Sequence, residues 1–228
     1  MKRILAMLLA LIFASCFMLV SCTDDDKNDN KGDGKDDGKI ESESQWNKIF
    51  AGELTNYTLE TGVYDEMSVA QLTDSKLYYK EVGYIQMYIE MMGDSYYAYA
   101  KPDSYDRYVW LTSNEAEELY DYAKAQSAIR FGSLVNQYDK FTYDSDKKVY
   151  ISTEQIQLNV GDNTTINCIN ISISFKNGAL NKFECRYTID GGDCPDEGYL
   201  LRVINVGSTS VDIPQDIIDE AKDSSMPS

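Results

Sequence analysis

The chain contains five cysteines and no histidine. Thiols are therefore the side chains of this protein that can take part in the widest range of reactions. The lack of histidine excludes a Ser-His-Asp triad, a Cys-His pair, an imidazole general base and His-ligated zinc or haem. Three cysteines, Cys168, Cys185 and Cys194, lie in the last third of the chain. Because they show no C-x-x-C spacing, we expect no zinc site, and we expect no other metal site.

A disulfide is the chemistry that these thiols suit in an exported protein. In the strands expected around them, alternation points Cys168 outward and Cys185 inward, which disfavours a bond between these two. A hairpin turn at Asn177-Gly178 brings Cys168 opposite about Tyr187, near the loop that holds Cys194. We therefore expect a disulfide between Cys168 and Cys194, while a Cys185–Cys194 bond and three free thiols remain alternatives.

Carboxylates are the other abundant reactive groups, with 38 Asp and Glu residues against 21 Lys and Arg residues and a net charge of −17. This charge repels phosphate backbones, so we expect no nucleic-acid partner. Chance pairs are inevitable among so many acids, and none has the signature of a glycosidase pair. Asp190-Gly191-Gly192-Asp193 is typical of a glycine turn with solvated carboxylates. We therefore expect no catalytic residue, no cofactor and no enzymatic activity.

The N-terminus is typical of a bacterial secretory signal. A basic Met1-Lys2-Arg3 precedes the apolar run Ile4–Val20, and Leu19-Val20-Ser21-Cys22 resembles the bacterial lipobox. The motif predicts that residues 1–21 are a signal peptide and that Cys22 is lipidated, so that acyl chains anchor the protein to a membrane of the bacterial cell envelope, at the cell surface or on a periplasmic face. The alternatives are a single transmembrane helix and cleavage before Cys16.

Residues 22–39 are predicted to form the acylated end and a disordered acidic tether, because residues 23–39 contain no apolar side chain. Asp26, Asn28, Asn30 and Asp37 partly match an EF-hand loop, but the glycine lies one position too late, so a solvated spacer is expected. We assign residues 40–220 to one β domain and residues 221–228 to a disordered tail.

The elements expected in that domain are mostly strands. A short helix is expected over Glu43–Phe50, and a second helical region follows a capping box at 112–115 and continues toward residue 138. About ten short strands are expected around it, ending in a closing strand at Ser208–Ile213. The pattern predicts an α+β fold, mainly antiparallel β, in which a curved meander sheet, or half barrel, is closed by one or two helices.

This layout resembles the LolA-like (LppX/LprG-like) lipoproteins of bacterial envelopes. The resemblance covers most of residues 42–214 and depends on the lipobox, the tether, the segment Trp46–Phe50, and the endings at 175–178, 187–191 and 203–214. It implies a curved sheet with a hydrophobic cavity, since several members of this fold bind lipids or lipidated carriers. Fold does not fix function, however. Such a pocket would be lined by apolar strand residues, namely Ile85, Met87, Ile89, Met91, Ile169, Ile171, Ile173 and Phe183. The alternative is that the apolar stretch forms an ordinary sheet core.

Tyrosine is abundant, with 18 residues, and seven of them lie between Tyr78 and Tyr99. These rings suit either cross-strand packing or stacking on sugars. We expect a monomeric, non-catalytic, membrane-anchored lipoprotein that binds a lipid or other apolar ligand, or an envelope partner, in or on the sheet. The alternative is a surface-exposed glycan- or protein-binding module.

Overall fold

The computed structural model describes residues 38–63, 66–112, 114–161, 164–189 and 198–223. Their helices are α2 (Glu43–Phe50), α3 (Asn114–Ser127) and α4 (Gln215–Asp223), with the 3₁₀ turns η2 (Phe131–Leu134) and η3 (Tyr138–Lys140). The first six strands are β1 (Tyr57–Val63), β2 (Glu66–Leu72), β3 (Lys76–Glu81), β4 (Ile85–Met92), β5 (Ser95–Pro102) and β6 (Val109–Thr112). The others are β7 (Ile129–Arg130), β8 (Thr142–Asp144), β9 (Val149–Ser152), β10 (Ile156–Val160), β11 (Thr164–Lys176), β12 (Ala179–Ile189) and β13 (Tyr199–Ile204).

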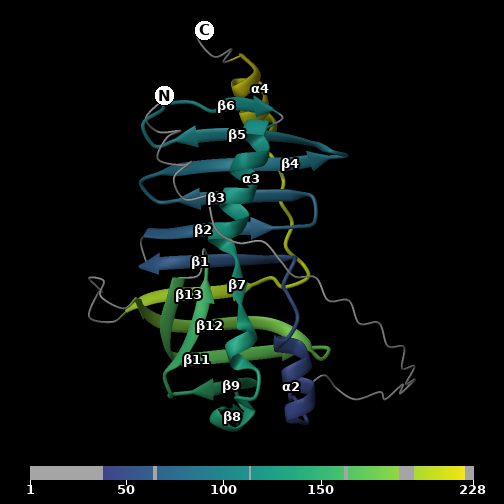
Figure 1. Ribbon diagram of the computed structural model, residues 1–228, viewed down its shortest axis with the longest axis vertical. Helices are drawn as coiled ribbons and strands as arrows, with labels where there is room; N and C mark the ends of the chain where they lie inside the picture. Colours follow the sequence, from purple (N-terminus) through teal and green to yellow (C-terminus); the bar gives the residue numbers. More distant parts are fainter. Residues whose placement is uncertain (1–37, 64–65, 113, 162–163, 190–197, 224–228) are drawn as a thin grey trace. The chain divides into compact units, whose positions relative to one another are not determined.

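Within the described ranges, thirteen strands form one antiparallel sheet, in the order β6-β5-β4-β3-β2-β1-β13-β12-β11-β10-β7 (Figure 1). Strand β9 pairs with β11 beside β10, and β8 pairs with β9. The first six strands are a sequential meander, and β1 pairs with β13 to join it to the C-terminal strands. The end strands of this order do not pair with one another, so the sheet is not closed into a barrel. The predicted α+β class and antiparallel meander are confirmed.

The two faces of the meander carry different helices. In β5, Ala98 and Ala100 belong to the main core together with residues of α3, whereas Tyr99 between them belongs to a small cluster with Ala221 of α4. Since successive side chains of a strand point to opposite faces, α3 and α4 cover opposite faces of the meander. Figure 1 shows α3 lying across the strands, and α3 contacts β5, β6 and β2.

An aromatic cluster holds α2 against the C-terminal strands. Trp46 is fully buried and lies within 6 Å of five other rings, and its indole N–H donates to the carbonyl of Leu134 at 2.8 Å. The hydroxyl of Tyr150 donates to the carbonyl of Ile40 at 2.8 Å and accepts from its N–H at 2.8 Å. The helix predicted over Glu43–Phe50 is confirmed, and its amphipathic face fills this end of the core.

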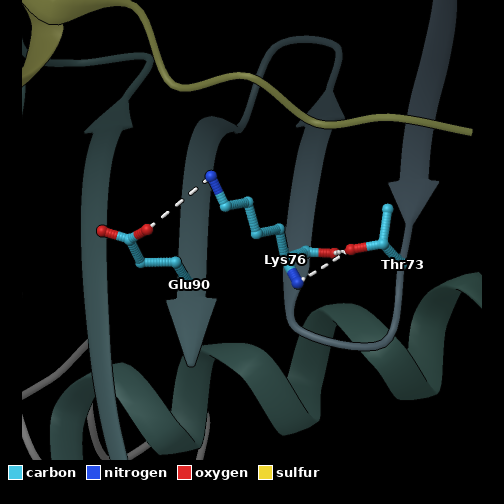
Figure 2. A network of polar contacts seen from close by, with 3 residues as sticks. All are labelled: Thr73, Lys76 and Glu90. Carbon is cyan, nitrogen blue, oxygen red and sulfur yellow. Dashed lines mark hydrogen bonds and ion pairs between the residues drawn. The ribbon is translucent and has the colours of Figure 1, made fainter. Parts of the chain in front are cut away.

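The α4 face of the meander is more polar. Figure 2 shows Lys76 at the start of β3, where its N–H donates to the Thr73 hydroxyl at 2.9 Å and its ammonium lies 3.8 Å from the Glu90 carboxylate. Lys76 and Glu90 are directly opposite in the β3–β4 ladder. An ion pair with this exposure contributes little to the stability of the sheet. Its formation reflects the register of the β3–β4 ladder.

Three sequence-based boundaries differ from the structure. α3 ends at Ser127 and is followed by β7, η2 and η3, so the helical region does not continue to residue 138. In the described range 198–223 no strand follows β13. The segment expected to form one is held as a loop by the Asn56 side chain, whose oxygen accepts from the Thr209 N–H at 2.8 Å. At the ends of the domain, Gly38 is buried beside Phe175, and α4 extends past residue 220, with Ala221 buried.

Candidate functional site

Two open surface hollows lie in the described part of the chain. One, of about 540 Å³, lies beside β8 and β9 and is crossed by the ion pair between Lys140 and Glu154 at 3.6 Å. The other, of about 470 Å³, lies where the β3–β4 and β5–β6 turns meet. We name it the turn hollow. Its lining residues are Glu66, Met67, Lys80, Glu81, Val82, Gly83, Ile85, Gln86, Lys101, Pro102, Asp103 and Tyr105.

Main-chain hydrogen bonds fix the shape of the turn hollow. The N–H of Tyr84 donates to the carbonyl of Glu81 at 3.1 Å and closes the β3–β4 turn, in which Gly83 has a positive φ of 72°. The N–H of Tyr105 donates to the carbonyl of Pro102 at 2.9 Å and closes the next turn. The N–H of Asp103 donates to the carbonyl of Tyr84 at 2.8 Å and joins the two turns. These hydrogen bonds therefore hold the two turns that border the hollow next to each other.

Exposed apolar side chains gather at this hollow. Val82 is 40% exposed and Tyr105 is 47% exposed, and both line the hollow. Tyr84, which is 48% exposed, lies in the same β3–β4 turn as Val82 but does not line the hollow. Turns favour small and polar residues, so the local backbone does not explain a valine and two tyrosines there. Clustered exposed apolar and aromatic groups are typical of binding surfaces, in which tyrosine is enriched.

The hollow carries charges of both signs. Lys80 and Lys101 bring ammonium groups, and Glu66, Glu81 and Asp103 bring carboxylates. Such a rim offers hydrogen-bond donors and acceptors around an apolar centre, which is the usual arrangement of a protein interface.

Glu81 connects the hollow to the core beneath α3. Its carboxylate accepts from the hydroxyl of Tyr79 at 3.1 Å and from the hydroxyl of Tyr122 at 3.3 Å. Burial, reinforced by the negative charge of Glu81, raises the pKa of Tyr122 to about 12 and also raises the pKa of Tyr79. Both hydroxyls are therefore protonated donors at neutral pH, and they hold the Glu81 side chain in place.

The residues expected to line an apolar pocket lie mostly in the packed core and not on a free surface. Met87, Ile89, Ile171, Ile173 and Phe183 each have no exposed area, so no water-sized space adjoins them. The helices α2 and α3 and the turn η2 contribute side chains to the same core. Of the remaining three, Ile85 and Met91 on β4 and Ile169 on β11 are half-buried.

The prediction that Cys168 and Cys185 point to opposite faces is wrong. A β-bulge interrupts the β11–β12 ladder between Ile169 and Ser172, and Asn170 within it has a positive φ of 52°. One extra residue reverses the alternation, so Cys168 is buried on the same face as Ile171, while Ile169 lies on the other face. Cys168 and Cys185 are both free thiols buried in the main core.

Most of the tyrosine run is used in packing. Tyr78 and Tyr88 are directly opposite in the β3–β4 ladder, with ring centroids 4.8 Å apart, and Tyr96 lies 5.2 Å from Tyr120 of α3. Tyr79 and Tyr99 are buried. Of the run, Tyr84 is the residue that presents a large exposed ring, and it lies in the β3–β4 turn between Gly83 and Ile85, which line the turn hollow.

Several sequence-predicted sites lie outside the described residues. These are the lipidation site Cys22, the EF-hand-like segment 26–37, the glycine turn 190–193 and Cys194, so the expected Cys168–Cys194 disulfide stays a prediction. Among the residues that the structure describes, no helix is long and apolar enough to cross a membrane.

Val82, Asp103 and Tyr105 were not predicted as site residues from the sequence. The available signal was the presence of apolar residues at turn positions, in Val82-Gly83-Tyr84 and after Pro102. The juxtaposition of the two turns depends on pairing between β4 and β5 and was not visible in either turn alone.

Comparison with protein-family models, with curated proteins and with solved structures finds no match for this chain. The resemblance to LolA-like lipoproteins therefore stays a prediction from the sequence.

Proposed function

We propose that this protein is a non-catalytic lipoprotein of the bacterial cell envelope, anchored through acyl chains on Cys22, that binds a protein partner at the turn hollow. The lipobox and the acidic tether support the anchor. The observation that carries the binding site is the exposure of Val82 and Tyr105, which both line one hollow between two turns joined by a main-chain hydrogen bond.

The face of the sheet that α3 covers is filled by core side chains. This favours a partner on the outer surface over an apolar ligand held inside the curved sheet. An enclosed apolar ligand needs free space next to residues such as Met87, Ile89 and Ile173, and these have no exposed area. Opening such a space means moving α3, whose Ala116 and Ala123 are also fully buried. Because close-packed cores resist such a change, the outer surface is the more accessible binding site.

The experiment compares the partners of three anchored full-length chains after chemical cross-linking in intact cells. One is unchanged, one carries Val82→Ser and Tyr105→Ser, and one carries Met92→Ser. Met92 is a matched control because it is exposed at the opposite end of β4. We expect one cross-linked species to be lost in the double variant and kept in the control. Equal cross-linking in all three chains would contradict the site.

A glycan is the second candidate for the turn hollow. Tyr105 is an exposed ring that lines the hollow together with the polar side chains of Lys80, Gln86 and Lys101, and sugars are bound by aromatic stacking combined with polar groups. A glycan array with the full chain discriminates the two candidates. Binding that disappears in Tyr105→Ser favours the glycan, and an array without hits favours the protein partner.

A further inference from the structure

Cys168 and Cys185 are brought together by the bulge in β11. Cys168 is directly opposite Tyr187 in the β11–β12 ladder, and Cys185 lies two residues from Tyr187 along β12. The two cysteines are thus diagonal neighbours on adjacent strands, and both point into the core, with 0% and 1% of their surface exposed. Such neighbours are close enough to interact across a sheet.

The two thiols are in contact. The Cys185 thiol makes a hydrogen bond with the Cys168 side chain, which together with burial raises the pKa of Cys185. The bulge follows Cys168 on β11, between Ile169 and Ser172, next to the point where the neighbour of β11 changes from β10 to β9. A bulge bends its strand and increases the local twist, so it shapes the spacing of the side chains on either side of it.

From this geometry we propose that a disulfide between Cys168 and Cys185 joins β11 to β12 when the chain folds in an oxidising compartment. The compartment rests on the proposed export of the protein, whereas the pairing rests on the placement of the two side chains. The buried cross-strand pair is a site of oxidation. The exported domain forms the disulfide there once, while it folds.

The chemistry is two successive thiol–disulfide exchanges with an oxidised disulfide carrier. The thiolate of one cysteine attacks the carrier disulfide, forms a mixed disulfide and releases one carrier thiolate. The thiolate of the other cysteine attacks its partner's sulfur in that mixed disulfide and releases the second carrier thiolate. The protein loses two electrons and two protons, and the carrier disulfide is reduced to two thiols.

The order of folding and oxidation follows from burial. In the folded, reduced protein the raised pKa keeps Cys185 as the thiol, and thiols react in exchange only as thiolates. Neither sulfur is accessible to a carrier in the folded core. The bond therefore forms before the core closes, and oxidation of protein that is already folded is slow.

Trypsin makes the test simple because it separates the three cysteines of the domain. Cys168 falls in peptide 149–176, Cys185 in peptide 183–186 and Cys194 in peptide 187–202. The full chain is unfolded under reducing conditions and refolded with oxidised glutathione, free thiols are alkylated, and the digest is analysed by mass spectrometry without reductant. In a second sample the same glutathione is added only after refolding.

We expect the first sample to contain peptide 149–176 linked to peptide 183–186, with Cys194 alkylated, and the second to contain at least tenfold less of this link. Cys194→Ala is the matched control and should keep the link, whereas Cys168→Ala should leave Cys185 alkylated. A link from peptide 187–202 to either of the others, or three alkylated cysteines in the first sample, would overturn the proposal.

The same digest of chain purified from cell membranes tests the compartment separately. The 168–185 link in that sample supports export to an oxidising compartment. Free thiols there, together with the link after refolding with glutathione, would overturn the export and leave the pairing established.

Discussion

The main-chain carbonyl of Tyr84 accepts a hydrogen bond from the N–H of Asp103 at 2.8 Å. This bond joins the β3–β4 turn to the start of the β5–β6 turn, and it brings the exposed side chains of Val82 and Tyr105 to one hollow. The hollow is therefore a property of the meander, because neither turn forms it alone.

Anchoring should depend on Cys22. In Cys22→Ser we expect the protein to move from the membrane fraction to the soluble fraction and to lose incorporation of labelled fatty acid, because the acyl chains supply the membrane affinity. Cys16→Ser is the matched control and should remain in the membrane fraction. Membrane association that survives Cys22→Ser unchanged would contradict lipidation at this residue.

The bulge at Asn170 should be visible in the stability of two neighbouring isoleucine variants. Ile171 is fully buried and Ile169 is half-buried on the other face. We expect Ile171→Ala to lower the free energy of unfolding by about 2–5 kcal/mol and Ile169→Ala by about 1 kcal/mol, measured by urea denaturation. Equal losses would mean that the two side chains share one face and that the bulge is absent.

The contact between Tyr150 and Ile40 should stabilise the start of the domain. Tyr150→Phe leaves the N–H of Ile40 buried without a partner, so we expect a loss of about 1–3 kcal/mol in the free energy of unfolding. Tyr138→Phe is the matched control, because the carbonyl that Tyr138 also contacts keeps its bond from Tyr150. A smaller loss in Tyr150→Phe than in Tyr138→Phe would contradict this arrangement.

Buried tyrosines should make the fold sensitive to alkali. Burial raises the pKa of Tyr57 and of Tyr122 from 10.0 in the unfolded chain to about 12 in the folded chain. The folded state therefore holds these protons more tightly, and the stability that this adds is complete below pH 10.0 and is lost as the pH rises toward about 12.

Thermal unfolding followed at several pH values checks this. We expect the Tm to fall between pH 10.0 and about 12, and to fall less steeply in Tyr122→Phe. A Tm that is constant across this range would show that these hydroxyls ionise as readily in the folded chain as in the unfolded one.

Local sequence signals predicted the regular parts of the fold. The Asn177-Gly178 turn forms where it was expected, with positive φ at both residues, because few sequences adopt that backbone as easily. The helix Glu43–Phe50 follows from its amphipathic spacing. In each case a short segment contained the whole physical reason for the structure.

Features set by distant segments were not predictable in the same way. The regular isoleucine alternation around Asn170 gives no sign of a bulge, whose position coincides with the change of neighbour from β10 to β9. The free apolar stripe predicted on β4 and β11 is filled by side chains of α2 and α3. The turn hollow likewise depends on strand pairing.

Site-specific photo-cross-linking tests the proposed binding site most directly. Benzoylphenylalanine is placed at position 105, or at position 92 as the control, in the anchored full-length chain, and the cells are irradiated. Both positions hold exposed side chains, at opposite ends of the meander strands. We expect position 105 to give a discrete protein adduct, and we expect position 92 to give at least tenfold less of it. Equal adducts at the two positions, or none at position 105, would contradict binding at the turn hollow.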